Sequence, residues 1–187
     1  MPKLPINGLD MFYDIVGDGP PVILISGVSS DHVGWKGTQL QPLLAAGFRV
    51  VLFDNRDVGQ TGESPIAGYT TRQFADDTAA LIRALDLGPT HIIGASMGGM
   101  IAQELALNHA DCVKTLSLVC TASKPDAYMS NAIQAWKNAS AKLSREEFLQ
   151  GRMPWIFTYR FYEKTAVMEA YKQRVLGNPS QIGRAHV

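Results

Sequence analysis

The sequence lacks an excess of charge of either sign, and this limits the kinds of molecule that the protein is expected to bind. Its 187 residues include 17 Lys and Arg and 17 Asp and Glu, so the formal net charge is zero. A nucleic-acid-binding surface needs a cluster of basic residues, and a solvating or ion-binding tail needs a run of acidic residues. We therefore expect no nucleic acid among its partners.

Cysteines and long apolar runs are also scarce. The two cysteines, Cys112 and Cys120, are too few for a disulfide framework or a four-ligand zinc site, and their apolar surroundings predict buried free thiols. The first residues carry no apolar run of the signal-peptide kind, and no stretch is long enough to span a membrane. With 46% hydrophobic residues the chain can bury a sizeable core. These features predict a soluble cytoplasmic protein without a membrane partner.

Short apolar runs alternate with helical patterns over residues 21–121. Before them, Asn7-Gly8 predicts the turn of a hairpin. Four short runs are rich in apolar residues on both faces, the first of them wholly apolar, as strands buried in a parallel sheet require. These runs are residues 22–25, 48–53, 91–93 and 113–120. The segments between them show helical spacing and end at Gly47 and at Gly88-Pro89. The alternation predicts an α/β fold with a mainly parallel sheet and flanking helices.

The pattern changes after about residue 124, where no further strand is found and helical spacing continues. Three helices are expected, and the second begins at a capping box, Ser144-Arg145-Glu146-Glu147. We expect residues 1–123 to form the N-terminal part of the sheet domain. Residues 124–180 then form a helical lid over the carboxyl ends of the strands.

One motif carries chemistry, Gly94-Ala95-Ser96-Met97-Gly98, which matches G-x-S-x-G. As a string it is weak, because a chain of this length has roughly a one-in-twenty chance of containing it. Its position is informative, because an apolar strand passes there directly into a helix. Such a junction is a nucleophile elbow, a turn so tight that small residues must flank it. We predict Ser96 as the nucleophile; the alternative is a glycine-rich turn with an idle serine.

A serine that attacks an ester carbonyl creates an oxyanion, which needs two hydrogen-bond donors. The first predicted donor is the backbone N–H of Met97, the residue after the nucleophile. The second should come from the loop after the first parallel strand, where the backbone N–H of Val28 is the best candidate. The alternative is that this loop is an ordinary glycine-containing strand exit.

The chain resembles the α/β-hydrolase superfamily, in particular its small esterase and lactonase members with a helical lid. The resemblance covers residues 3–180, and four pieces carry it in the expected order. They are Ile25-Ser26-Gly27-Val28, Asp54-Asn55-Arg56-Asp57-Val58-Gly59-Gln60-Thr61, the elbow at Ser96, and Pro154-Trp155-Ile156-Phe157. One departure is Ser26, which stands where the family usually has His. We interpret the charges of the Asp54 loop as structural.

The resemblance also implies a chain order of Ser, then acid, then His, with the last two on loops after later strands. No such strand is found after residue 121. None of the four histidines, which are His32, His91, His109 and His186, is well placed to accept the Ser96 proton. Asp126 stays open as the acid of a variant arrangement.

The last seven residues, 181–187, resemble the translation of a sequencing adapter. We therefore expect a tail of non-native origin and a reading frame cut short within the lid. The alternative is a genuinely short protein whose tail folds over the lid. A chain cut short would be inactive for lack of the triad acid and His. Its strand at 113–120 would become an exposed apolar edge, which favours aggregation.

The favoured hypothesis is a serine hydrolase of small carboxylic esters or lactones. Neither a metal-ligand cluster nor a phosphate-binding loop occurs, so we expect no cofactor and no metal. A peptidase, a carbon–carbon bond hydrolase or a perhydrolase could share this half of the fold. From a different class, the same fold also serves non-catalytic ligand-binding proteins.

Overall fold

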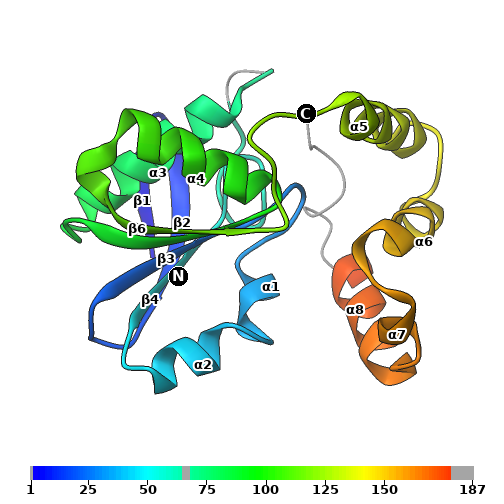
Figure 1. The fold of residues 1–187 in the computed structure, drawn as a ribbon, viewed down its shortest axis with the longest axis horizontal. Helices are drawn as coiled ribbons and strands as arrows, with labels where there is room; N and C mark the ends of the chain where they lie inside the picture. Colours follow the sequence, from blue (N-terminus) through cyan, green and yellow to red (C-terminus); the bar gives the residue numbers. More distant parts are fainter. Residues whose placement is uncertain (1, 65–67, 178–187) are drawn as a thin grey trace. The chain divides into compact units, whose positions relative to one another are not determined.

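The computed structural model describes residues 2–64 and 68–177, and the chain divides into two compact units. Unit 1 extends to Lys124 and contains the sheet, whereas unit 2 begins at Pro125 and is helical (Figure 1). The predicted tail at 181–187 lies outside the described residues, and so does His186. The prediction that unit 2 acts as a lid stays a prediction.

Unit 1 is built on a six-stranded mixed sheet with the order β1-β2-β4-β3-β5-β6. Its strands are β1 (Lys3–Ile6), β2 (Leu9–Val16), β3 (Pro21–Ile25), β4 (Arg49–Phe53), β5 (Thr90–Ala95) and β6 (Val113–Val119). β1 and β2 form the predicted hairpin, and both turn residues, Asn7 and Gly8, have positive φ angles. β2 joins β4 antiparallel, while β3 to β6 are parallel. The mainly parallel α/β fold is therefore confirmed.

Helices cover both faces of this sheet, which explains why its central strands are continuously apolar (Figure 1). The helices are α1 (Val33–Lys36), α2 (Leu40–Ala45), α3 (Thr71–Ala84) and α4 (Met97–Asn108), with a 3₁₀ turn at Ala110–Cys112. Along β3, Val22 and Leu24 pack with side chains of α1 and α2. Ile23 and Ile25 belong to the larger cluster with α3 and α4. The period of two in a strand thus divides one apolar run between two cores.

Unit 2 contains the helices α5 (Ala127–Ser140), α6 (Arg145–Ile156), α7 (Tyr159–Tyr162) and α8 (Thr165–Gly177). The predicted capping box is present at the start of α6. Ser144 Oγ accepts a hydrogen bond from Glu147 N at 3.3 Å, and the Glu147 carboxylate accepts one from Ser144 N at 2.9 Å. No helix in the described part of the chain combines the length and apolar character needed to cross a bilayer.

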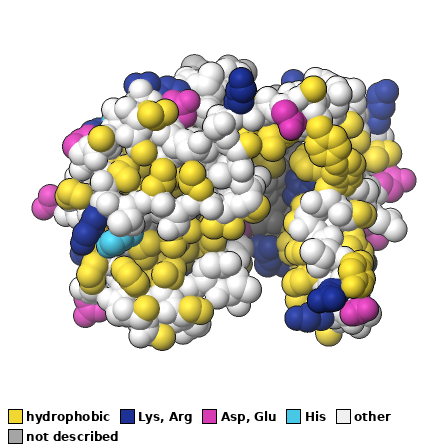
Figure 2. Space-filling model, in the orientation of Figure 1, with side chains coloured by type: hydrophobic (Ala, Val, Ile, Leu, Met, Phe, Trp, Pro, Cys, Tyr) yellow, Lys and Arg dark blue, Asp and Glu magenta, His cyan; other side chains and the backbone are white. Residues whose placement is uncertain are grey.

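β6 is the last strand of the sheet and pairs only with β5 among the described residues. Its Leu116, Leu118 and Val119 are 37–46% exposed, and hydrophobic side chains gather over this region in Figure 2. The prediction of two buried thiols is correct for Cys112 and wrong for Cys120, which is exposed. The physical reason is that Cys120 follows the open edge strand, where nothing described covers it.

Candidate active site

Ser96 lies at the junction where β5 ends and α4 begins. Its φ and ψ angles are 56° and −122°, a region that non-glycine residues seldom occupy. The backbone is held there from both sides: Ser96 N donates to Val119 O at 2.9 Å, and Ser96 O accepts from Gly99 N at 2.9 Å. The side chain is exposed, and its hydroxyl has no hydrogen-bond partner among the described residues. The junction therefore presents a free hydroxyl group.

The two glycines of the motif are explained by close backbone approach. A Cβ atom on Gly98 would lie 2.0 Å from the carbonyl oxygen of Ile25, at the end of β3. One on Gly94 would lie 2.3 Å from the carbonyl oxygen of Gly98 itself. Both distances are far inside van der Waals contact, so only glycine fits. The G-x-S-x-G pattern thus marks the place where α4 folds back against β5 and β3.

The loop after β3 contacts Ser96 directly. A Cβ atom on Gly27 would lie 3.1 Å from Ser96 Cβ, which places the Gly27 backbone against the nucleophile candidate. The contact follows from the sheet, because β3 and β5 are parallel neighbours with Ile25 beside Gly94. Val28 comes next along this loop. Neither the Val28 N–H nor the Met97 N–H has an acceptor in the part of the chain that is described. Their role as oxyanion donors stays a prediction.

A buried carboxylate holds this loop in place. Asp54, at the end of β4, is fully buried and accepts hydrogen bonds from His32 N at 2.7 Å and Gln60 N at 2.8 Å. The Nδ1 atom of His32 lies 2.9 Å from the same carboxylate. Ser26, at the position that departs from the family pattern, accepts a hydrogen bond from Trp35 Nε1 at 2.8 Å. These contacts support the structural interpretation of the Asp54 loop.

The rest of the Asp54 loop is fixed by two further polar contacts. Arg56 donates two hydrogen bonds of 2.8 Å to the buried carboxylate of Asp77 on α3. Asp57 accepts a hydrogen bond from the Tyr69 hydroxyl. Burial, together with this contact to Asp57, raises the pKa of Tyr69 above its ordinary value.

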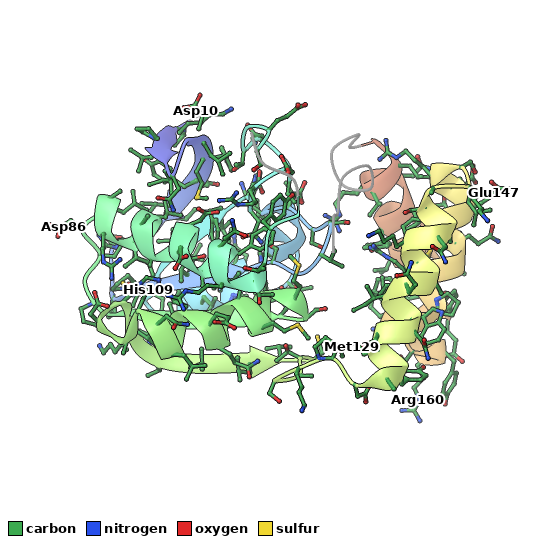
Figure 3. All side chains as sticks on the ribbon, turned by 90° about the horizontal axis from the view of Figure 1, so that it is seen from above. Asp10, Asp86, His109, Met129, Glu147 and Arg160 are labelled. Carbon is green, nitrogen blue, oxygen red and sulfur yellow. The ribbon has the colours of Figure 1, made fainter. Side chains whose placement is uncertain are left out.

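The described histidines are each engaged away from Ser96. His32 contacts Asp54, and His91 Nδ1 lies 2.8 Å from Thr115 Oγ1 on β6. His109, labelled in Figure 3, follows the last residue of α4, and its Nε2 lies 2.7 Å from Asp76. Asp126, the candidate for a variant acid, caps α5 by accepting a hydrogen bond from Met129 N at 2.7 Å. None of these groups contacts the Ser96 hydroxyl.

A metal ion would need a cluster of ligating side chains among the described residues. No group of three or more His, Cys, Asp or Glu side chains there is arranged to hold a metal ion. The expectation of a cofactor-free reaction stays a prediction. What the structure shows at this site is an exposed serine hydroxyl with the Gly27 backbone against it.

Comparison with known proteins assigns the family. A family model described as the alpha/beta hydrolase fold matches residues 20–178. The chain therefore belongs to the α/β-hydrolase fold family, as the sequence motifs predicted.

Two curated relatives illustrate the range of names within this family. The protein BpoC of Mycobacterium tuberculosis H37Rv, named for a non-heme bromoperoxidase, is 38% identical over 135 residues, which are 72% of this chain and 49% of that protein. The protein RutD of Variovorax paradoxus, named for a carbamate hydrolase, is 33% identical over 129 residues, which are 68% of this chain and 48% of that protein. The chain thus spans about half the length of the curated relatives it matches.

Solved structures show the same fold. The enol-lactonase of Burkholderia xenovorans LB400 superposes with a TM-score of 0.81 at 26% identity, over 98% of this chain and 70% of that one. A thermophilic esterase of Thermogutta terrifontis gives a TM-score of 0.77 at 26% identity, over 98% of this chain and 69% of that one.

Proposed function

We propose that the protein is a serine hydrolase that cleaves small carboxylic esters or lactones, with Ser96 as its nucleophile. One observation carries the proposal: the exposed Ser96 hydroxyl stands at a strained strand–helix junction, and the Gly27 backbone lies against it. Strain at a single exposed serine is typical of a residue positioned for reaction rather than for packing.

The proposed reaction follows from this geometry. Ser96 Oγ attacks the acyl carbon of the substrate, and its proton passes to a base. The carbonyl oxygen becomes an oxyanion that accepts hydrogen bonds from the Val28 and Met97 amides. Collapse of this intermediate expels the alkoxide, which takes up the proton, and leaves an acyl group on Ser96. Water then attacks the acyl group and releases the acid.

The base and the acid that orients it are not found around Ser96, since the described histidines are engaged elsewhere. We propose that they belong to the part of the longer relatives that this chain does not span. Without them the hydroxyl is a poor nucleophile, because removing the base of a serine protease lowers turnover by about 10⁶. The chain of 187 residues is then inactive or very slow.

The names of the relatives support acyl transfer as the reaction class. Lactones, esters and carbamates all present a carbonyl carbon attached to a heteroatom leaving group. One nucleophile and one pair of oxyanion donors can serve all three. The prediction of an ester or lactone substrate is narrower than this shared chemistry and needs its own test.

Covalent labelling with a fluorophosphonate tests the nucleophile. The protein is prepared as the present chain and as a chain extended to the length of its relatives. In the extended chain we expect labelling that Ser96→Ala abolishes and that Ser117→Ala, at an exposed serine on β6, leaves unchanged. The present chain should label slower by several orders of magnitude. Equal labelling of Ser96→Ala and the parent would end the assignment.

Turnover of a phenyl ester and of a small aliphatic lactone by the extended chain then tests the substrate class. Hydrolysis of either that depends on Ser96 supports the proposal. A chain that labels at Ser96 but hydrolyses neither substrate would retain the nucleophile and refute the ester or lactone prediction. A chain that neither labels nor turns over would favour the non-catalytic ligand-binding alternative.

A further inference from the structure

Unit 2 contains a hollow of about 380 Å³ between α5 and α6, which is within the size range of small-molecule sites. Aromatic side chains form much of its wall, namely Tyr128, Trp136 and Trp155, whose rings contact one another at centroid distances near 6 Å. Small side chains of α5, among them Ala132 and Ala135, leave the space open. All of its lining residues belong to unit 2, so the hollow is a feature of that unit alone.

A cation that forms no ion pair with any described residue lies in this apolar lining. Arg152 of α6 is only 8% exposed, and its Nε is buried without a hydrogen-bond partner among the described residues. The ring of Phe148 lies 5.7 Å from the guanidinium and is the neighbour that the structure gives it. Burying a charged group is costly unless acceptors replace the water that it loses, so buried arginines are normally paired.

The same chain shows how a buried arginine is usually accommodated. In unit 1, Arg56 is 5% exposed and donates two hydrogen bonds to the carboxylate of Asp77. Arg152 has comparable burial, but no Asp or Glu occurs among the residues that line its hollow. The difference indicates that the acceptor for Arg152 comes from a bound molecule.

The chemistry of the lining defines that molecule. A guanidinium presents a planar fork of N–H donors that matches the two oxygens of a carboxylate. Asn131 of α5 lines the same hollow, and its side-chain amide offers a further donor. The aromatic wall favours a ligand with an apolar body.

We propose that the α5–α6 hollow binds a small organic acid, with its carboxylate on Arg152 and its apolar body against Trp136 and Trp155. The site lies within unit 2 and does not depend on Ser96 or on the proposed hydrolase activity.

Tryptophan fluorescence of the present chain provides the test. Two of its three tryptophans line the hollow, and the third, Trp35, is buried in unit 1. The probe is 4-phenylbutyrate, and 4-phenylbutan-1-ol serves as a matched molecule without the charge. We expect saturable quenching by the acid, with an affinity at least about tenfold above that of the alcohol, because a hydrogen bond to a charged group is lost with the alcohol. Equal affinities would overturn the proposal.

Substitution of Arg152 separates the contribution of its charge to binding from the contribution of the apolar wall. Arg152→Met keeps the length of the stem and should reduce the affinity for the acid to that for the alcohol. Arg160→Met, at the exposed arginine of α7 labelled in Figure 3, removes the same charge outside the hollow and should change neither. Far-ultraviolet circular dichroism reports whether each variant folds. Unchanged acid binding by a folded Arg152→Met variant would refute the role of Arg152.

A third variant keeps the test valid if Arg152→Met does not fold. Ala135 is exposed on α5 and lines the hollow, so Ala135→Trp fills the space without removing a core side chain. We expect it to weaken binding of the acid and of the alcohol alike. If the parent chain shows no saturable quenching up to about 10 mM acid, another part of the chain or a second copy covers the hollow and the proposal is wrong.

Discussion

Ser96 keeps a backbone conformation that a non-glycine residue retains only where its surroundings determine it. Those surroundings are backbone atoms of three strands: the carbonyl of Val119 on β6, Gly94 on β5 and the end of β3 beneath Gly98. The position of the hydroxyl is therefore set largely by main-chain packing, with one side-chain contribution from Thr121, whose Oγ1 donates a hydrogen bond of 2.7 Å to Ser96 O. A change that separates α4 from β3 should affect both the stability of unit 1 and the reactivity of Ser96.

Gly98→Ala tests this packing. Its Cβ would meet the Ile25 carbonyl oxygen at 2.0 Å, and a backbone atom in a central strand cannot move aside cheaply. We expect a loss of about 2–3 kcal/mol in the free energy of unfolding, as in other overpacked sites. Urea unfolding followed by circular dichroism measures it. Gly37→Ala is the matched control, because nothing lies within 4 Å of its Cβ and its φ is −76°. Identical midpoints for both variants would contradict the prediction.

The contact between Tyr69 and Asp57 should make the stability of the folded chain depend on pH in the alkaline range. Burial and the hydrogen bond to Asp57 raise the pKa of its hydroxyl, so the folded state favours the neutral phenol. This contribution to stability is fully present below the unfolded pKa of about 10 and is lost as the pH rises above it. The difference in unfolding free energy between the parent and Tyr69→Phe should therefore shrink above that pH. Urea unfolding at a series of pH values measures it.

The control for this pH dependence is Tyr159→Phe, because Tyr159 is 72% exposed. Its hydroxyl contacts Arg160 rather than a carboxylate, so its difference from the parent should not shrink in the way expected for Tyr69→Phe. A difference for Tyr69→Phe that stays constant would mean that the Tyr69 hydroxyl titrates like an exposed tyrosine, contrary to the prediction.

Helix α6 carries Arg152 and the second wall of the α5–α6 hollow, and its start depends on one capping box. The hydrogen bonds from the side chain and the backbone N–H of Ser144 hold the pKa of Glu147 below its ordinary value. Because the folded pKa is lowered, this contribution is present above the unfolded pKa of about 4.3 and is lost as the pH falls. The cap thus contributes fully at neutral pH.

Ser144→Ala removes the cap and should raise the unfolding equilibrium constant of unit 2 about fivefold, a typical loss for an N-cap serine. Fluorescence of Trp136 and Trp155 during urea unfolding reports on this unit. Ser130→Ala is the control, because Ser130 is exposed within α5 and its hydroxyl caps nothing. We expect it to be neutral or slightly stabilising, since alanine has the higher helix propensity. Equal effects of the two substitutions would show that the box contributes nothing.

The elements that could be predicted from the sequence are those whose signal is local. Strands β3 and β4 each carry an unbroken apolar run because helices cover both faces of the sheet, and the capping box at Ser144 occupies four consecutive residues. Helices α1 and α7 have four residues each, too few to show a period of 3.6, and they were not predicted. The capping box of α3, Thr70 to Gln73, has the same local signature as the one at Ser144 and could have been found.

In the candidate site, too, features with a local sequence signal could be predicted and contacts between distant segments could not. The elbow at Ser96 could be predicted because strand, turn and helix adjoin in the sequence. The contact of Gly27 with Ser96 spans 69 residues and depends on β3 lying beside β5. The bond between His32 and Asp54 depends on β3 lying beside β4. The motif pattern predicted that the loop after β3 serves the same site as Ser96, but it could not predict these particular contacts, because strand order is fixed by packing of the whole sheet.

At the scale of the whole molecule, the order of the strands determines where the candidate site lies, and it leaves β6 without a second neighbouring strand among the described residues. β3 is central, and its neighbours β4 and β5 bring Asp54 and Ser96 to the same carboxyl end, where ligands bind in open α/β sheets. β6 lies at the margin, with apolar side chains exposed (Figure 2). With a formal net charge of zero, little electrostatic repulsion keeps two such edges apart. We expect the chain to associate through β6.

Leu118→Lys tests this edge, because an inserted lysine is a natural protection against strand pairing between molecules. Leu118 is 45% exposed, so the substitution removes no core packing, and it should reduce the associated fraction in sedimentation velocity. Leu107→Lys adds the same charge on α4, where the side chain is 80% exposed, and it should leave association unchanged. Equal suppression by both would assign association to net charge rather than to β6. A parent chain that sediments as a monomer and unfolds cooperatively would show that the β6 edge is harmless.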